Sequence, residues 1–140
     1  TNYAVPSKDI TQIYNEQLPS ILAKPVDVVI IMTGVNDAYH NISLDVFKQK
    51  YSSMLSLLQA KGMQTICMTT FRTHTPTIDT ELYDEYMLTL KGKGCNIVVD
   101  VKAYEKPSWA KNINGQIDLH PTEQAYSDVS NIVLNILYML

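Results

Sequence analysis

The sequence predicts one α/β domain in which a parallel β-sheet is covered by helices on both faces. Three short segments, at residues 26–32, 64–69 and 96–101, are rich in β-branched residues and almost continuously apolar, as in strands buried on both sides. Helical patterns separate these segments, and such alternation is typical of βαβ units with right-handed crossovers. A length of 140 residues suits a single hydrophobic core, so we expect one domain over residues 1–140.

The first two helices are predicted from apolar residues at a 3.6-residue spacing. One spans residues 9–22 and is disturbed near Pro19, because proline cannot donate the backbone hydrogen bond that a helix interior needs. The other spans residues 43–60, with Ser43 placed to cap its first turn and Gly62 placed to end it. The second pattern has the more regular apolar stripe.

Two more helices follow the second and third strands. The pattern between residues 80 and 90 is ended by Gly92, and the last helix begins after Thr122, a residue type that caps helix N-termini. Irregular stretches are expected at residues 71–79 and 102–116, and both follow the carboxyl end of a strand. Ligands bind at this edge of open α/β sheets, so we expect the functional residues there.

Charge and apolar content argue against two classes of partner. Eleven basic and 14 acidic residues give a formal net charge of -3, and no run of Lys or Arg could neutralise the phosphates of a nucleic acid. The most apolar strand is interrupted at Asp27 and the apolar C-terminal stretch at Asn135, well short of the roughly 20 apolar residues that cross a bilayer. No membrane span is predicted.

The two cysteines give no sign of a metal or redox motif. Cys67 and Cys95 have neither CxxC spacing nor histidines in metal-ligand register. We expect free thiols, buried or half-buried, and leave a disulfide open as the alternative. The sequence therefore does not indicate a compartment.

The first polar cluster, Gly34, Asn36 and Asp37, follows the first predicted strand. A side-chain amide at the rim of a sheet is a neutral N–H donor, suited to stabilising the oxyanion that develops in acyl transfer. A plain strand-exit turn explains the same residue types equally well, because Gly, Asn and Asp are common in turns.

A second candidate group lies before the last helix. Asp118-Leu119-His120-Pro121 follows the last predicted strand, and the His120 imidazole is the side chain best suited to general-base work near neutral pH. A histidine before a proline is by itself more often a surface loop residue. Because both groups fall on one edge of one sheet, we favour a shared site.

Together these segments resemble the conserved blocks of the SGNH, or GDSL-type, hydrolases. Gly34-x-Asn36-Asp37 is similar to the third block of that family, residues 118–121 to the fifth, and residues 2–7 to the second. The resemblance runs in order through the whole chain. It implies a flavodoxin-like three-layer α/β/α sandwich of five parallel strands, hydrolysis of a small-molecule or glycan ester, and no cofactor.

The resemblance also implies roles for individual residues. In such enzymes a serine attacks the acyl carbon, and His120 would accept its proton with Asp118 beside it. Asn36 would donate to the oxyanion, together with backbone N–H groups for which Ser7 and Gly34 are the candidates. Ser7 stands where the family carries a glycine.

Three further residues are candidates for substrate contact. Asp37 and Tyr39 lie next to the proposed oxyanion donor, and His74 lies in a loop on the same edge of the sheet, where an exposed loop histidine is the simpler interpretation. Neither His74 nor His40 has a partner at metal-ligand spacing, so no metal site is predicted.

Departures from the family pattern keep a second interpretation open. No Gly-Asp-Ser occurs in the chain, so the nucleophilic serine is expected from outside these residues, in a domain that is N-terminally incomplete. Ile117 lies three positions before His120, where the family carries an aspartate. With Ser7 in place of glycine, these departures also fit a binding or structural module that has kept the hydrolase fold and lost catalysis.

The implied sheet has a consequence for partners. In a sheet of order 2-1-3-4-5, the absent first strand would lie beside residues 26–32, whose edge we expect to pair with another chain or segment. Receiver domains and flavin carriers share this type of sheet. The clustered acidic residues and the phosphate-binding loop that they need are not visible in the sequence.

Overall fold

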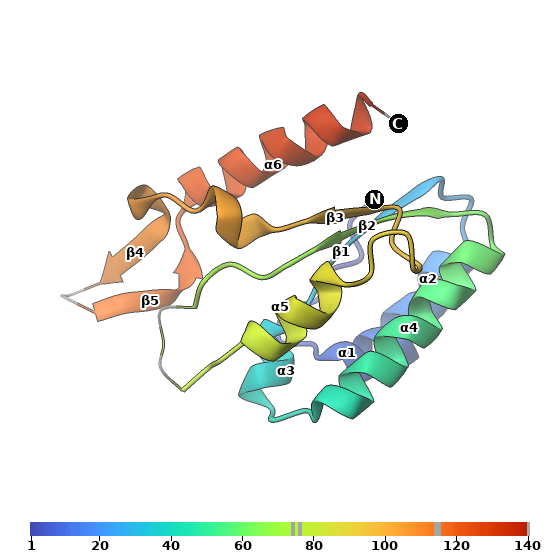
Figure 1. The fold of residues 1–140 in the computed structure, drawn as a ribbon, viewed down its shortest axis with the longest axis horizontal. Helices are drawn as coiled ribbons and strands as arrows, with labels where there is room; N and C mark the ends of the chain where they lie inside the picture. The colour runs from blue at the N-terminus through green and yellow to red at the C-terminus, as the bar shows by residue number, and fades with distance from the viewer. Residues whose placement is uncertain (74, 76, 114–115, 140) are drawn as a thin grey trace.

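The computed structural model describes residues 1–73, 75, 77–113 and 116–139, with only the backbone described at 111–113 and 116–119. Its central sheet has three parallel strands in the order β1-β2-β3, at Val28–Met32, Gln64–Met68 and Ile97–Val99 (Figure 1). Val29 lies opposite Thr65, and Cys67 lies opposite Val98. The three predicted strands and their parallel arrangement are confirmed.

All four predicted helices form, and the last three are α4 (Leu44–Ala60), α5 (Glu81–Leu88) and α6 (Glu123–Leu137). The Ser43 hydroxyl accepts the Val46 N–H at 3.4 Å, and α4 ends before Gly62, whose φ of 75° suits a residue without a side chain. The Thr122 hydroxyl accepts the Ala125 N–H at 3.3 Å in the same way. The caps expected from the sequence therefore form.

The predicted helix at residues 9–22 forms as three consecutive pieces, α1 (Ile10–Gln12), a π-helical turn (Ile13–Gln17) and α2 (Leu18–Leu22). The Leu18 N–H donates to the Ile13 carbonyl, five residues back, which widens the helix in front of Pro19. The disturbance expected near Pro19 is therefore present, and it lies on the N-terminal side of the proline.

Several elements were not predicted, namely α3 (Val35–Tyr39), 3₁₀ turns at Val101–Tyr104 and Pro107–Trp109, and a hairpin of β4 (Ala110–Ile113) and β5 (Gln116–Pro121). The hairpin is antiparallel, with Ala110 opposite Pro121. The expectation of an irregular stretch at 102–116 was therefore wrong for its second half, and His120 lies in a strand. The described residues hold three parallel strands instead of the five that the resemblance implies.

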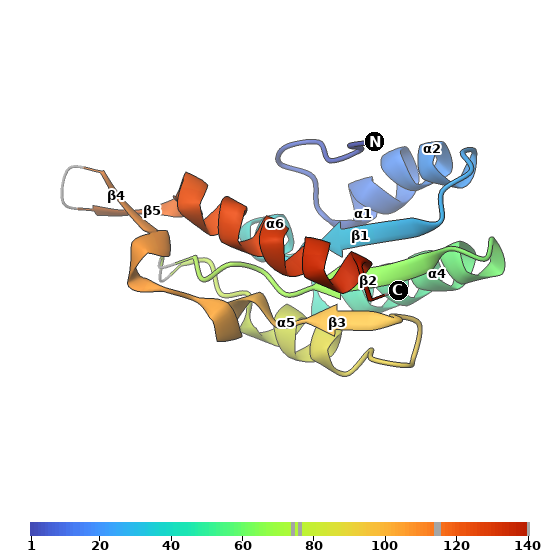
Figure 2. The same ribbon diagram turned by 90° about the horizontal axis from the view of Figure 1, so that it is seen from above.

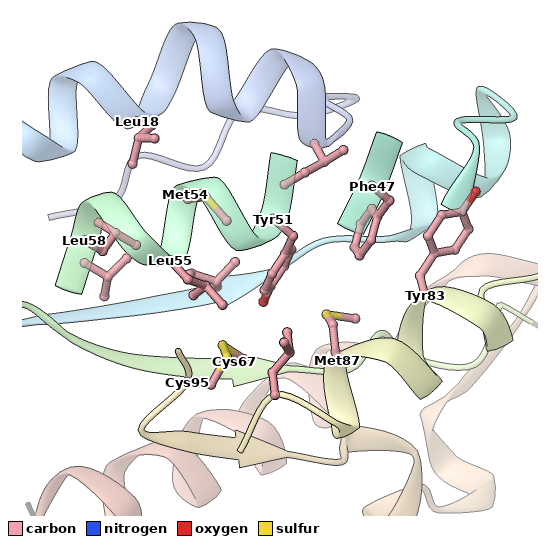
Figure 3. Packing of buried hydrophobic residues seen from close by; sticks show 14 of the residues in the cluster. Leu18, Phe47, Tyr51, Met54, Leu55, Leu58, Cys67, Tyr83, Met87 and Cys95 are labelled. Atoms are coloured by element: carbon pink, nitrogen blue, oxygen red, sulfur yellow. A yellow bond between two sulfur atoms is a disulfide. The ribbon is translucent and has the colours of Figure 1, made fainter. Parts of the chain in front are cut away.

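Helices cover both faces of the parallel sheet (Figures 1 and 2). α6 lies on one face, whereas α1, α2, α4 and α5 lie on the other, which gives the α/β/α layering expected from the sequence. The larger core lies on the α4 side, where the fully buried rings of Phe47 and Tyr51 stack with centroids 5.4 Å apart (Figure 3). Among the described residues, no helix is long and apolar enough to span a membrane.

Strand β1 forms one edge of the three-stranded sheet. Its side chains alternate in burial: Val29 and Ile31 face the α4 core, whereas Ile30 is 47% exposed and Met32 is 38% exposed. Helix α6 packs its buried residues over β2 and β3, where they form a second cluster that includes Ile66, Met68, Val99, Ala125, Val129 and Val133. Two apolar side chains of β1 are therefore left in contact with solvent.

The two cysteines form a disulfide, which corrects the expectation of free thiols. Cys67 lies in β2 and Cys95 in the turn that leads to β3, with their Cα atoms 6.0 Å apart. Gly94, with φ 117°, brings this turn onto α4, because a Cβ at this position would lie 3.1 Å from Cδ1 of Leu55. The bond therefore forms on the α4 side of the sheet (Figure 3).

Candidate active site

Gly34 sets the direction in which the chain leaves β1. Its φ of 132° is one that residues with a side chain rarely adopt, and an added Cβ would lie 3.0 Å from Cγ2 of Thr70. Gly34 also precedes the first residue of α3. The tight exit that the sequence indicated at this position thus requires glycine on two grounds, and it places Asn36 in the first turn of α3.

Asn36 is half-buried, and its side-chain amide donates to the carbonyl oxygen of Lys8 at 3.2 Å. This contact joins the strand exit to the N-terminal segment, 28 residues away in sequence. A side-chain amide has two N–H groups, and the Lys8 carbonyl accepts one of them. Among the described residues, the second N–H of Asn36 has no acceptor within hydrogen-bond distance, so it can donate to a ligand.

Asp37 is fully buried and serves the fold at this point. One carboxylate oxygen accepts the Ile10 N–H at 2.8 Å, and the other accepts the Thr33 hydroxyl at 3.0 Å. Burial raises the pKa of the Asp37 carboxyl, and these two hydrogen bonds oppose the rise. The sequence suggested Asp37 as a substrate contact, whereas the structure places its side chain in the interior.

Ser7 is exposed and has a φ of 62°, in the left-handed region that favours glycine. The resemblance aligned this serine with a family glycine, and its backbone has the conformation that a glycine would adopt without strain. The next residue, Lys8, holds Asn36 through its carbonyl and pairs with Glu16 through its ammonium at 2.7 Å. The Ser7 backbone is therefore one residue away from a contact with the Asn36 side chain.

A pair that the sequence analysis did not identify lies beside Asn36. Nδ1 of His40 lies 3.0 Å from Oδ2 of Asp9, whose side chain is 10% exposed. The exposed Tyr39 ring has its centroid 5.4 Å from that of the His40 ring. Asp9 also caps α1, because its other oxygen accepts the N–H groups of Thr11 and Gln12. The only sequence signal was the position of Asp9 as an N-cap.

His120 lies in β5 and is exposed. The residues after it are fixed to the 3₁₀ turn at Pro107–Trp109: the Thr122 N–H donates to the Trp109 carbonyl at 3.0 Å, and the Thr122 hydroxyl donates to the Ser108 carbonyl at 2.9 Å. Asp118 lies two residues earlier in the same strand, and its side chain lies outside the described part of the structure, as does His74.

Asp128 of α6 anchors this second region. Its Oδ2 accepts from the Trp109 indole and from the Lys106 ammonium, each at 2.8 Å, while Oδ1 accepts from Gln124 at 2.9 Å. These hydrogen bonds, with the one from Lys106 the largest contribution, lower the pKa of the Asp128 carboxyl to about 2. The carboxylate thus ties α6 to the turn that frames His120.

A polar cluster lies between the two regions. Asp84 is buried, and its carboxylate accepts from the Thr70 N–H and hydroxyl, the Thr80 hydroxyl and the Lys102 ammonium at distances of 2.6–2.9 Å. Asp84 and Lys102 border a cleft of about 350 Å³ at the carboxyl ends of β2 and β3. Lys102 and Arg72 also border a smaller hollow with Pro121, the residue after His120.

The sequence-derived candidates thus fall into two groups. Ser7, Gly34, Asn36, Asp37 and Tyr39 gather around α3, whereas Asp118 and His120 belong to the β4–β5 hairpin. Both groups lie beyond the ends to which the arrows of β1, β2 and β3 point (Figures 1 and 2). Within the described residues, no group of three or more His, Cys, Asp or Glu side chains is arranged to hold a metal ion.

Comparison with known families agrees with the block pattern in the sequence. Residues 1–127 match the profile of the GDSL-like Lipase/Acylhydrolase family. The chain belongs to this family. The match includes both the segment around Asn36 and the strand that carries His120, so both groups of candidate residues lie within the family region of this GDSL-like chain.

Solved structures give the same fold for this GDSL-like chain. A protein from Desulfitobacterium hafniense DCB-2, assigned to the G-D-S-L family of lipolytic proteins, is 20% identical, with a TM-score of 0.66 over 86% of this chain and 70% of its own length. The protein YxiM from Bacillus subtilis is 22% identical, with a TM-score of 0.59 over 69% of this chain. The chain spans 31% of the length of YxiM. No curated protein sequence matches the chain.

Proposed function

We propose that this chain carries the oxyanion-binding and general-base parts of an SGNH-type serine ester hydrolase. In this proposal Asn36 and the backbone N–H groups of Ser7 and Gly34 donate to the oxyanion, and His120 accepts the proton of the attacking serine, with Asp118 beside it. The substrate is a small-molecule or glycan ester. The serine comes from a segment outside these 140 residues, and the reaction needs no cofactor.

The observation that carries the proposal is the 3.2 Å hydrogen bond from the Asn36 amide to the Lys8 carbonyl. It fixes the side chain of one candidate donor next to the segment that bears another, Ser7. An oxyanion hole needs donors that are held in place before the reaction, because donors that must reorganise lose much of their stabilising effect. The glycine-like φ of Ser7 supports the same assignment.

The position of His120 supports its role as the base. It is exposed on β5, beyond the carboxyl ends of the parallel strands, which is the edge where ligands bind in sheets of this type. The Asp84–Lys102 cleft lies on that same edge and offers space for the alcohol or acyl part of an ester. Imidazole is the side chain that most often serves as a general base in catalysis.

We further propose that the free edge of β1 pairs with the strand that supplies the serine. Ile30 and Met32 are exposed on one face of β1, and a strand added to its edge, with the helix that follows it, would cover them. This pairing would bring the carboxyl end of the added strand next to Gly34 and Asn36.

Hydrolysis of p-nitrophenyl acetate tests the proposal. The 140 residues alone are expected to show no ester turnover above the buffer, whereas a form extended by the segment that bears the serine is expected to turn the ester over. In the extended form, Asn36→Ala is expected to lower kcat about 10²–10³-fold. Rapid, His120-dependent hydrolysis by the 140 residues alone would show that no outside serine is needed. An extended form without turnover would favour the binding or structural module.

A further inference from the structure

The segment Lys8–Asp9–Ile10 is joined to α3 and the residue that follows it by three consecutive contacts. Lys8 accepts the Asn36 amide at 3.2 Å, Asp9 lies 3.0 Å from Nδ1 of His40, and the Ile10 N–H donates to Asp37 at 2.8 Å. Each residue of the segment thus has its own partner. The three contacts hold this stretch of backbone in one position against the strand exit.

His40 contacts both parts, α3 through its backbone and the Lys8–Asp9–Ile10 segment through its ring. Its backbone N–H donates to the Asn36 carbonyl at 2.8 Å, at the C-terminal end of α3. Its ring reaches across to Asp9, and 35% of the side chain is exposed. A substitution that removes the His40 ring therefore removes its contact with the Lys8–Asp9–Ile10 segment. The backbone hydrogen bond from residue 40 to Asn36 stays in place.

The two carboxylate oxygens of Asp9 have separate tasks. Oδ1 accepts from Thr11 and Gln12 and so belongs to the α1 cap, whereas Oδ2 faces His40. Burial alone would raise the pKa of Asp9, yet the hydrogen bonds from Gln12, His40 and Thr11 together lower it. The side-chain link between Asp9 and the α3 region can therefore be removed at His40 without removing the helix cap.

We propose that His40, held by Asp9, is a positioning residue that fixes the Ser7–Lys8 backbone against Asn36 and so sets the distance between two donors of the oxyanion hole. The inference rests on the proposed function for its catalytic meaning. Its structural content stands on the three contacts alone. Ser7 is exposed and has a left-handed φ, so the hold on its neighbours Lys8 and Asp9 decides where its N–H points.

The first test measures positioning without catalysis, on the 140-residue chain. His40→Ala is expected to raise the amide hydrogen-exchange rate of Ile10, whose N–H is bonded to Asp37, at least tenfold and to shift the Asn36 side-chain amide signals in the NMR spectrum. His40→Asn is expected to restore both readouts, because its Nδ2 can take the place of Nδ1 toward Asp9. Glu16→Gln, which removes the Lys8 pair on the same segment, is the matched control and is expected to leave them unchanged.

The second test measures catalysis in the serine-bearing form described above. His40→Ala is expected to lower kcat about tenfold with little change in KM, and His40→Asn to recover most of the loss. Unchanged exchange rates and Asn36 signals in His40→Ala would overturn the positioning role whatever the activity. Altered NMR readouts with unchanged kcat would overturn its catalytic meaning. A wild-type form without ester turnover counts against the proposed function, and the NMR result still decides the positioning.

Discussion

The two groups of candidate residues are held in place by different means. Asn36 sits beside a buried carboxylate, Asp37, whose two partners are Thr33, the residue after β1, and Ile10 of α1. His120 lies on a hairpin whose neighbouring turn is held by Asp128, an aspartate near the surface with partners that include Lys106. The first region therefore depends on interior hydrogen bonds and close packing, and the second on surface hydrogen bonds that respond to pH and salt.

The largest expected effect comes from removing the buried carboxylate. Asp37→Ala leaves the Ile10 N–H and the Thr33 hydroxyl without their acceptor inside the protein, and is expected to lower the free energy of unfolding by about 3 kcal/mol. Urea unfolding followed by circular dichroism measures the difference. A loss below about 1 kcal/mol would show that water replaces the carboxylate and that this region is no more interior than the hairpin.

Asp37→Asn serves as the matched control, because an amide can accept from Ile10 and donate to Thr33. Burial raises the pKa of Asp37, so the folded state holds this proton more tightly than the unfolded chain. That contribution to stability is complete at low pH and is lost as the pH rises above about 4 through the raised pKa. The asparagine variant lacks this loss, so its stability relative to the wild type is expected to increase from pH 4 to pH 7.

A smaller loss is expected where the backbone leaves β1. Gly34→Ala combines a φ of 132° with a Cβ only 3.0 Å from Thr70, and is expected to lower the free energy of unfolding by about 2 kcal/mol. Gly62→Ala is the control, because its φ is also positive but its Cβ would meet nothing within 4 Å. Equal losses in the two variants would mean that the contact with Thr70 has no part in shaping this exit.

The hairpin side is expected to show a weaker and pH-dependent effect. The hydrogen bonds at Asp128 lower its pKa to about 2, so its contribution to stability is present above the unfolded pKa of about 4 and is lost as the pH falls toward 2. Asp128→Asn is therefore expected to lower Tm at pH 7, with the difference shrinking between pH 4 and pH 2. Asp27→Asn, at an exposed site before β1, controls for the loss of one negative charge. A Tm difference between Asp128→Asn and the wild type that stays constant from pH 4 to pH 2 would contradict the role given to the Asp128 hydrogen bonds.

The smallest expected effect is a gain. Ser7→Gly relieves the left-handed φ of 62° and adds flexibility to the unfolded chain, and the balance is expected to stabilise the protein by about 0.5 kcal/mol. The thermal stability of Ser7→Gly is compared with that of Ser52→Gly, a matched change inside α4. The helix variant is expected to be destabilised, and destabilisation of both would show that Ser7 does not carry the strain assigned to it.

Local sequence signals predicted the parts of the fold that depend on neighbouring residues. Ser43 and Thr122 mark the starts of α4 and α6, and the buried stripe that includes Phe47 and Leu58 fixes the face of α4 that packs on the sheet. α3 has five residues, too few for a periodic pattern, and therefore was not predicted. An Asn-Gly pair, a common hairpin turn sequence, stands between β4 and β5, but neither strand has the continuous apolar run that identified the parallel strands.

The candidate site was only partly predictable, because local sequence signals do not reveal contacts between residues that are distant in the sequence. Asn36 and His120 became candidates because each follows a strand pattern, and Asp37 became one together with Asn36. Nothing local indicates that the Asp37 carboxylate is buried. The contact between Asp9 and His40 joins residues 31 positions apart, and that between Cys67 and Cys95 joins residues 28 positions apart. Such pairs depend on which strands become neighbours, which a single sequence does not reveal.

The disulfide between Cys67 and Cys95 also has a mechanical consequence. It closes a covalent loop that contains α5 and the buried Asp84. A force applied to the two ends of the chain passes through the bond and bypasses the 28-residue separation between the cysteines, so roughly 95 Å of extended chain is withheld until the bond is reduced. Stretched between its termini, the oxidised protein would therefore have a shorter contour length than the reduced one, and the border of the cleft formed by α5 would be shielded from the load.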